Sequence, residues 1–568
     1  MRMTSVRILM MTAVALGVAA CSSGNGGKNA PKLVSASGTT TTGIVTDGAS
    51  HVAYLLNAGP SYGTTGELHV ADAIGNDTKI ATGMSIGAYA FSGDGKGLIF
   101  AQANASGDDA NLQWVDMSNP ASPPTMVFAG GLQTQPINPG SSAPTFTVGL
   151  TGEGFFSPSG RYYVCGVLQP NVGVSPDLHV VDVDTGTDVF TRANGAFDYL
   201  ELVLPNDVMV FQDAVGGNSG VAGGAGLQTL FWVDLTGGSP TATTIDTRTG
   251  AYTPTGDNKT IVYQNADARE LYTWDAVARP AAGTKVASNA LTFAVAGSGP
   301  IAYLGTDGSF HVVGLDGTAV VDVDGATAKA DPFSPVVISD DGADAYYFQA
   351  VDSQDSQGTL MHVSATAGAT PNMVASAASI GDVHPQPGGV LLYLAGLDAM
   401  GVSGNAFQSA RDGSGATALG TKVPVGFLQV QVPATVATGT PSTMWMSAHL
   451  FNASEDMTQR LVDGIRAISG GLELTTTTGT TMLDPMARIA QLSVSDDFAD
   501  VVYVGGSAFD STVDNYVGGL SFVPVATPTM KPAMPLLTGV SEVGTVVKRQ
   551  LFVNAPKASK PGVYLVTF

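Results

Sequence analysis

The sequence predicts an all-β fold, and three observations support this prediction. Short apolar stretches alternate with turn residues along most of the 568 residues. Glycine occurs 71 times, whereas charged residues make up only 12%, about half the usual share. Long helical periodicity is nearly absent. A chain of this length requires several domains or one array of repeated units.

The N-terminal segment, residues 1–20, has the order of parts of a secretory signal peptide. Arg2 and Arg7 give it a positive start, and the apolar run Ile8–Ala20 has 13 residues. That run is too short to span a bilayer core of about 30 Å, but it suits a signal peptide. It ends in Val18-Ala19-Ala20-Cys21, which resembles the bacterial lipobox, where the cysteine is acylated and becomes the mature N-terminus.

This resemblance implies that Cys21 carries lipid such as palmitate and attaches the protein to the bacterial cell envelope. Ser22 stands where an Asp can mark inner-membrane retention in such lipoproteins, so the outer membrane is favoured. The alternative is an ordinary signal peptide cut near Ala20. Residues 21–31, CSSGNGGKNAP, are rich in Gly and Ser and predict a flexible tether. Two or three acyl chains on Cys21 would anchor the protein firmly.

From residue 32 to residue 568 one unit recurs at steps of about 50 residues. In Phe156–Thr187, FSPSGRYYVCGVLQPNVGVSPDLHVVDVDTGT, a turn precedes an apolar strand, a polar loop, a second apolar strand and another turn. The Ser-Pro-Ser-Gly core predicts a tight turn whose glycine takes a positive φ. Copies of the first half include FSGDGKGLIFAQA, TPTGDNKTIVYQN and ISDDGADAYYFQA, and copies of the second strand include LHVAD, LQWVD, LFWVD and LYTWD.

About 40 to 60 residues holding four short strands is the pattern of a β-propeller blade. A single blade cannot bury its own apolar faces, so neighbouring blades must stack around a ring. The motif resembles the TolB-type (WD40-like) propeller repeat from about Gly43 to the C-terminus. We therefore predict ten to eleven four-stranded blade units over residues 32–568, as two rings or as one large ring. Two rings are favoured, although no linker marks a boundary.

The ends of the repeat region predict how the array closes. Arg549–Asn554 and Pro561–Phe568 have the pattern of strands 2 and 3 of an eleventh unit, after which the sequence stops. KLVSA, Lys32–Ala36, is a strand without a unit of its own. We expect this strand to supply the outer strand of the last blade.

The loops between strands 2 and 3 are the expected binding surface. In a four-stranded blade these loops lie on one face, and the 1–2 and 3–4 loops lie on the other. Long loops on a rigid scaffold often carry function, although they can also be merely tolerated insertions. Units five and six have almost no 2–3 loop. The long ones are Gly59–Gly66, Asn104–Ala110, Gln169–Pro176, Asp213–Gly226, Asp352–Gly358, Asp398–Gly404 and Gly506–Gly518.

Candidate catalytic residues are few. The one G-x-S-x-G sequence, Gly59-Pro60-Ser61-Tyr62-Gly63, lies between two strands with no helix after it, so we do not expect a hydrolase nucleophile there. His69, His179 and His311 hold the same place in strand 3, and His362 is one residue off. Equal positions in successive blades lie around a ring, so we interpret these histidines as semi-buried blade residues rather than zinc ligands.

Two acidic clusters raise the alternative of a calcium site. Asp182, Asp184 and Asp188 are close in sequence, and so are Asp322 and Asp324. Carboxylates beside glycine suit Ca²⁺, but the full EF-hand pattern is absent, and Asp at strand ends is ordinary in turns. We therefore predict no metal ligand, no cofactor-binding residue and no catalytic residue.

Charge and cysteine content limit the possible partners. The net charge of −23 repels nucleic acid and anionic lipid headgroups, so nucleic acid is not an expected partner. Cys165 lies in an apolar strand and is predicted to be a small buried hydrophobe. With Cys21 acylated, the body of the mature protein would have a single cysteine and no internal disulfide.

The leading hypothesis is a non-enzymatic, lipid-anchored propeller of the bacterial envelope that binds a protein or glycan on its 2–3 loop face. The alternative is an enzyme, a hydrolase or lyase of extracellular polymers, with its site in loops around the propeller channel. Sequence spacing would not reveal such a site, because its residues would come from different blades. A third possibility is a structural or surface-coat role.

Overall fold

The structure, a computed structural model, is almost entirely β in the residues that it describes. One short helix, α1 (Gly325–Ala328), occurs among them. The described residues are 31–36, 42–47, 50–57, 65–84, 88–92, 95–103, 110–132, 134–136, 146–148, 154–167, 177–192, 201–214, 228–297, 299–352, 356–386, 389–398, 401, 403–425, 472–476, 479–484, 491–494, 500–513, 515–524, 535–544 and 549–567.

The strands form antiparallel sheets in which consecutive strands are neighbours. The first three units have four strands each. Unit one is β2 (Thr42–Thr46), β3 (His51–Leu56), β4 (Gly66–Asp72) and β5 (Asp77–Met84). Unit two is β6 (Tyr89–Phe91), β7 (Gly97–Ala103), β8 (Ala110–Asp116) and β9 (Thr125–Leu132). Unit three is β12 (Gly154–Phe156), β13 (Tyr162–Val167), β14 (Asp177–Asp182) and β15 (Thr187–Arg192), after a small hairpin of β10 (Thr134–Pro136) and β11 (Phe146–Val148).

Units four to six continue the same order. Unit four is β16 (Leu202–Val203), β17 (Val208–Ala214), β18 (Gln228–Asp234) and β19 (Thr243–Pro254). Unit five is β19 again with β20 (Thr260–Asn265), β21 (Glu270–Asp275) and β22 (Thr284–Ala287). Unit six is β23 (Ala290–Val295), β24 (Ile301–Gly305), β25 (Phe310–Val313) and β26 (Ala319–Val323).

The remaining units complete the described strands. Unit seven is β27 (Val337–Ile338), β28 (Asp344–Asp352), β29 (Gln357–Ser364) and β30 (Asn372–Gln386), and unit eight is β30 with β31 (Val390–Ala395), β32 (Ser403–Ala410) and β33 (Thr417–Pro424). The hairpin of β34 (Leu472–Thr476) and β35 (Gly479–Asp484) precedes unit nine, which is β36 (Gln491–Val494), β37 (Asp500–Asp510), β38 (Asn515–Pro524) and β39 (Leu537–Val540). The closing unit is β40 (Glu542–Val543), β41 (Gln550–Ala555), β42 (Gly562–Thr567) and β1 (Lys32–Ser35).

Two long strands each belong to two units. The first part of β19 pairs with β18 as the outer strand of unit four, and its later part pairs with β20 as the inner strand of unit five. β30 joins units seven and eight in the same way. Each pair of units therefore forms one seven-stranded sheet.

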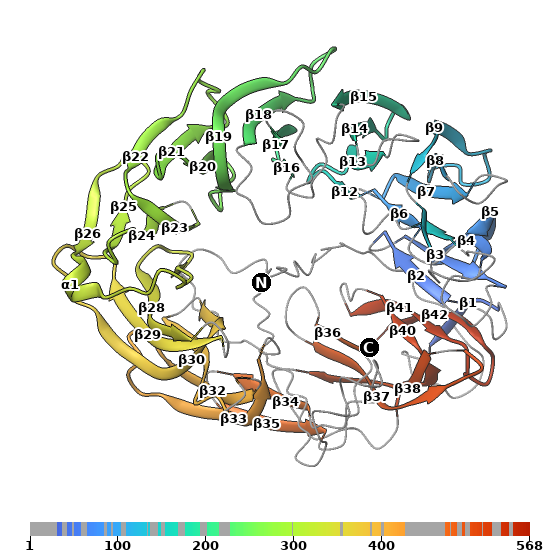
Figure 1. Ribbon diagram of the computed structural model, residues 1–568. Coiled ribbons are helices and arrows are strands. Elements are labelled where there is room, and N and C mark those ends of the chain that lie inside the picture. The colour runs from blue at the N-terminus through green and yellow to red at the C-terminus, as the bar shows by residue number, and fades with distance from the viewer. Residues whose placement is uncertain are drawn as a thin grey trace.

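The sheets follow one another around a common centre, as in a β-propeller (Figure 1). Clusters of buried apolar side chains join each unit to the next from unit one to unit eight, and another joins unit nine to the closing unit. One further cluster joins the closing unit to unit one and contains Val34, Tyr54 and Leu565. Because the last unit packs on the first, the preference for two rings is wrong for the described residues. The blade number stays a prediction, since residues 426–471 lie outside those described.

The expected closure of the array is confirmed. β1 pairs antiparallel with β42, with Lys32 opposite Leu565, Leu33 opposite Tyr564 and Ser35 opposite Val563. The N-terminal strand therefore supplies the outer strand of the unit whose other strands come from the C-terminal end of the chain.

The predicted turn between strands 1 and 2 is also confirmed. The glycines of three copies take positive φ angles, 71° at Gly95, 74° at Gly160 and 68° at Gly342, and Asn258 takes 58° in a fourth. A Ser or Thr at the start of each turn accepts a hydrogen bond from the N–H five residues later, which holds the turn closed. These residues are Ser92, Ser157, Thr255 and Ser339.

Tyrosines at the start of strand 2 tie neighbouring units together. The hydroxyl of Tyr162 in unit three donates to the carbonyl of Leu235 in unit four at 2.8 Å. The hydroxyl of Tyr346 in unit seven donates to the carbonyl of Arg411 in unit eight at 3.0 Å. A buried hydroxyl needs such a partner, so the repeated Tyr-Tyr pair of the motif serves both packing and contact between units.

Candidate functional site

The two faces of the ring are built differently. Antiparallel order places the 1–2 and 3–4 connections at one end of the strands, a surface that we call the turn face. The 2–3 connections and the links between units lie at the other end, which we call the hairpin face. In turns on the turn face, the Asp that ends strand 3 accepts hydrogen bonds from following N–H groups, as Asp72 does from Ile74 and Gly75. Connections on both faces vary in length: eight residues separate strands 3 and 4 of units two, four and five, whereas four residues separate strands 2 and 3 of units five, six and nine.

Most residues of the predicted long 2–3 loops lie outside the described residues. The prediction for Gly506–Gly518 is wrong, because β37 and β38 continue as a paired hairpin to Asp510 opposite Asn515. The glycines there mark an irregularity between Gly505 and Ala508, where the register shifts, rather than a loop. Asp352–Gly358 is shortened in the same way, with Asp352 opposite Gln357. Units five and six have only short connections, as expected.

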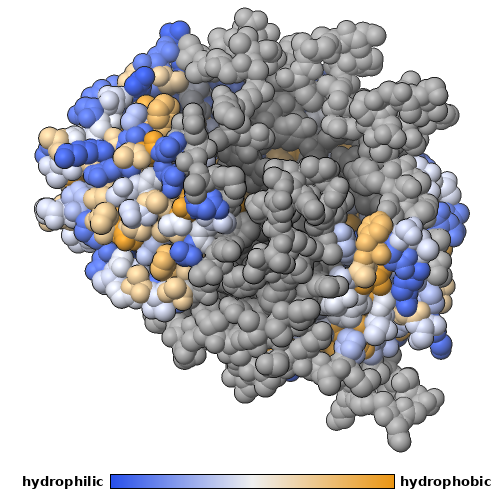
Figure 2. All heavy atoms as spheres, turned by 60° about the horizontal axis from the view of Figure 1, so that its bottom comes forward, coloured by the Kyte–Doolittle hydropathy of each residue, from blue (hydrophilic) through white to orange (hydrophobic). Residues whose placement is uncertain are grey.

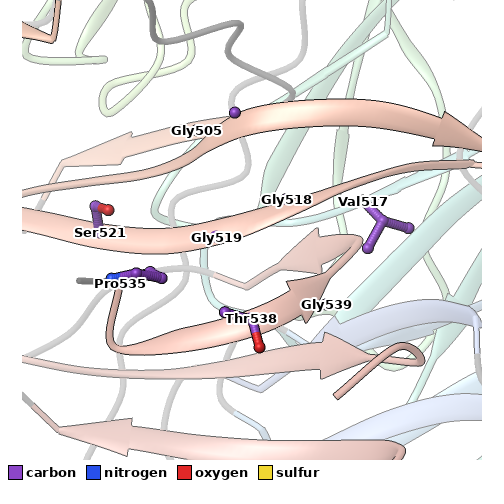
Figure 3. A pocket seen from close by; sticks show the side chains of 9 residues that line it. Gly505, Val517, Gly518, Gly519, Ser521, Pro535, Thr538 and Gly539 are labelled. Carbon is purple, nitrogen blue, oxygen red and sulfur yellow. The ribbon is translucent and has the colours of Figure 1, made fainter. Parts of the chain in front are cut away.

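A pocket of about 340 Å³ lies beside the β37–β38 hairpin (Figure 3). Glycines keep it open. A Cβ atom on Gly518 would lie 2.7 Å from the carbonyl oxygen of Gly505, and one on Gly519 would lie 2.9 Å from a side-chain carbon of Pro535. The pocket is lined by Gly505, Gly506, Val517, Gly518, Gly519, Ser521, Pro535, Thr538 and Gly539.

The tip of the same hairpin carries an exposed aromatic side chain. Phe509 is 53% exposed, and its ring lies edge-on to that of Tyr516 with a centroid distance of 5.6 Å. Lys557 of the closing unit lies 3.0 Å from Asp510 and also donates to Thr512. Hydrogen bonds from Thr512 and then Lys557 lower the pKa of Asp510 to about 2. The tip is thus tied to the neighbouring unit while Phe509 stays open to solvent.

A second exposed phenylalanine, Phe333, also lies on the hairpin face. Its side chain is 73% exposed, and it belongs to the link between units six and seven. The other large exposed apolar residues are aliphatic. Figure 2 shows hydrophobic residues scattered among hydrophilic ones on the described surface in that view. Exposed aromatic side chains of the described residues are therefore found on the hairpin face, in two separate places.

The aligned histidines are held inside their own units. Their side chains are only 12–21% exposed, and each ring bonds to an Asp on strand 4 of the same unit. The rings of His69 and His311 also stack on Tyr54 and Tyr303 of strand 2. The pairs are His69–Asp77 (2.9 Å), His179–Asp188 (2.6 Å) and His311–Asp322 (3.0 Å).

His362 belongs to a buried polar network between units seven and eight. Arg411 donates to Asp341 at 2.7 Å and to Asp344 at 3.0 Å, and His362 Nε2 lies 2.7 Å from Asp344. The side chains of Arg411, Asp344 and His362 are 12%, 15% and 6% exposed. Burial lowers the pKa of His362, but hydrogen bonds to Asp344 and Asn372 raise it further, so the net shift is upward. A substrate has no access to so buried a pair, which makes it a tie between units.

The remaining acidic candidates serve local turns. Asp182 accepts the N–H of Asp184 and pairs with Arg161 at 2.9 Å, while Asp324 caps α1 by accepting the N–H of Ala326. Across the described ranges, three or more His, Cys, Asp or Glu side chains do not gather in a group that could hold a metal ion.

Three sequence predictions lie outside the described residues. The first is the lipidation site Cys21 with the signal segment before it, and the second is the tether apart from Pro31. The third is the sequence Gly59-Pro60-Ser61-Tyr62-Gly63. Cys165 is fully buried in β13, as predicted. In the part of the chain that the structure describes, we find no helix long and apolar enough to cross a membrane.

Sequence reasoning missed the aromatic tip and the Arg411 network. The sequence predicts Phe509 within the long loop Gly506–Gly518, yet the run Asp510–Asn515 has the polar composition of a tight hairpin turn and indicates where the tip lies. Arg411 and Asp344 are 67 residues apart, so no local pattern joins them.

Comparisons with known proteins give no family. No family model matches the sequence, and no curated protein matches it. Among solved structures, a eukaryotic initiation factor is 11% identical over 65% of this chain and 85% of its own, with a TM-score of 0.36. A prolyl endopeptidase is 14% identical over 66% of this chain and 56% of its own, with a TM-score of 0.28. TolB from Acinetobacter baumannii is 16% identical over 50% and 65%, with a TM-score of 0.22. Likenesses this weak give no functional information, and the fold assignment depends on the sheets themselves.

Proposed function

We propose that this protein is a lipid-anchored β-propeller of the bacterial cell envelope, with the outer membrane favoured, that binds a protein or glycan partner on its hairpin face. The lipobox-like sequence ending in Cys21 supports the anchor. The ring of four-stranded units supports a rigid scaffold for binding.

The observation that carries the proposal is the exposure of Phe509 at the tip of the β37–β38 hairpin. Exposed aromatic rings are enriched at binding surfaces, because they bury a large apolar area on contact at a small cost in side-chain entropy. The adjoining pocket of about 340 Å³ is large enough for a side chain or a sugar ring. Its floor of glycines exposes backbone groups, and Ser521 and Thr538 contribute hydroxyl groups.

The alternative of a polymer-processing enzyme has less support. Its catalytic groups would have to converge, whereas the described histidines are each paired within a unit or buried between units. The hairpin tip offers an exposed aromatic ring, and the charged pair beside it, Asp510 and Lys557, ties the tip to the closing unit.

Photo-crosslinking in living cells tests partner binding. A photoreactive residue at Ser511, beside Phe509, should give ultraviolet-dependent adducts, a discrete band for a protein or a ladder for a glycan. The same residue at Val277, which is 63% exposed on the turn face, is the matched control. Adding Phe509→Ala should remove the Ser511 adducts. Equal adducts from both positions, or no effect of Phe509→Ala, would contradict the proposal.

Labelling with a palmitate analogue tests the anchor. The wild-type protein should incorporate the label and sediment with membranes, whereas Cys21→Ser should do neither. Equal labelling of the two proteins would remove the anchor from the proposal.

A further inference from the structure

The closing unit lacks one connection that complete units have. In unit one, strand 3 ends at Asp72 and a short turn leads to strand 4 at Asp77. In the closing unit strand 3 is β42, which ends at Thr567, and strand 4 is β1, which starts at Lys32. These two strands are therefore neighbours in the sheet without a 3–4 turn between them.

The register fixes the end from which β1 enters. Lys32 lies opposite Leu565, two residues before the end of β42, and Ser35 lies opposite Val563, nearer its start. The chain before Lys32 therefore reaches the ring on the turn face. A contact with the next unit agrees with this, since Lys32 Nζ donates to the carbonyl oxygen of Ala73 at 2.9 Å, and Ala73 lies in the 3–4 turn of unit one.

We infer that the tether leaves the ring from the turn face, so that the anchored protein presents its hairpin face away from the membrane. This inference depends on the lipid anchor of the proposed function. It identifies the partner class more closely as a soluble protein or glycan that approaches from the side opposite the anchor, rather than a lipid or a membrane-embedded segment beneath the ring.

The length of the tether supports this orientation. The tether, residues 21–31, spans on average roughly 17–20 Å as a flexible chain. A strand of six or seven residues is about 20–23 Å long, which sets the least thickness of the ring. Turning the hairpin face to the bilayer would require the tether to run back along at least this thickness, so its average span would be used before it reached the membrane.

Two single-cysteine variants measure the orientation directly. Ile74→Cys places a label in the turn beside Lys32, on a residue that is 62% exposed, and Ser511→Cys places it on the exposed hairpin tip of unit nine. Both units adjoin the closing unit, so the two sites differ mainly in the face that they occupy. Cys165 is buried and acylated Cys21 is unreactive, so a maleimide dye labels the new thiol.

The labelled, acylated proteins are placed on vesicles that contain a headgroup-labelled acceptor lipid. We expect more efficient energy transfer from Ile74→Cys than from Ser511→Cys, and Val277→Cys should resemble Ile74→Cys. Equal or reversed efficiencies in proteins that remain membrane-bound would overturn the orientation and leave the anchor standing. Transfer that survives in Cys21→Ser would instead overturn the anchor itself.

Discussion

At the scale of single residues, paired charges hold neighbouring units together. Asp344 bonds to both His362 and Arg411, and Arg411 also bonds to Asp341. Burial raises the pKa of Asp344, but hydrogen bonds from His362 and Arg411 lower it by more, so this carboxylate stays charged. Without the Asp344 carboxylate, Arg411 would keep Asp341 and His362 would keep Asn372, but each of these buried groups would lose one charged partner.

Asp344→Asn should therefore lower stability. Loss of charge-assisted hydrogen bonds costs about 1.5–3 kcal/mol in such surroundings. Asp322→Asn is the matched control, because Asp322 also bonds to a strand-3 histidine but is 74% exposed. Thermal unfolding should show a clearly lower midpoint for Asp344→Asn alone. Similar midpoints for the two variants would show that burial does not strengthen the network.

The same network predicts a pH dependence. The pKa of His362 is raised above its ordinary value of 6.5, so its stabilising effect is complete below that value and is lost as pH rises through the folded-state pKa. The difference in stability between wild type and His362→Gln should be larger at pH 5.5 than at pH 8.5, as measured by urea unfolding at both pH values. A larger difference at the higher pH would contradict the upward shift.

At the scale of elements, the turn between strands 1 and 2 is the best-defined feature. The Ser or Thr that closes it and the residue of positive φ that ends it recur in several units. A non-glycine residue at such a φ costs about 1–2 kcal/mol. At Gly342 a Cβ atom would also lie 2.5 Å from Pro300 of the preceding unit.

Gly342→Ala should thus destabilise the protein by more than the φ penalty alone. Asn258→Gly, at the equivalent place of another unit, should be neutral or slightly stabilising. The backbone there has a φ of 58°, which glycine adopts without steric cost. Differential scanning calorimetry of the two variants checks both signs. A wild-type midpoint for Gly342→Ala would mean that the turn is not constrained as described.

These turns and the strands after them were predictable because their signals are local. Ser157 and Gly160 lie within four residues of each other, and the apolar strand follows at once. The sharing of β19 and β30 between units was not predictable, because strand length and pairing there depend on how two units meet. The exposure of Phe509 likewise depends on tertiary packing. The alternation of apolar and polar residues along a strand does not reveal it.

At the scale of the whole molecule, β1 joins the two ends of the chain. Val34 and Leu565 pack in one cluster with Val52 and Tyr54 of unit one, so this strand contributes to pairing in the closing unit and to packing across the junction. Without it, β42, most of whose residues are buried, would replace β1 as the edge strand of this sheet, and an exposed apolar edge favours aggregation.

Deletion of residues 22–36 should therefore lower the thermal midpoint and increase self-association. Deletion of residues 22–30 removes only tether and is the matched control. Calorimetry and light scattering measure both effects. Identical behaviour of the two deletions would show that β1 is dispensable for the ring.

A disulfide between β1 and β42 tests the closed ring most directly. Paired residues on antiparallel strands lie within disulfide distance, and Lys32 is opposite Leu565. In a Cys21→Ser background, we predict that Lys32→Cys with Leu565→Cys forms an intramolecular disulfide in the monomer, detected by mass spectrometry of non-reduced peptides. Lys32→Cys with Val563→Cys, two residues out of register, should form it far less. No intramolecular disulfide in the first pair, or equal yields in both, would contradict the closure of first strand on last.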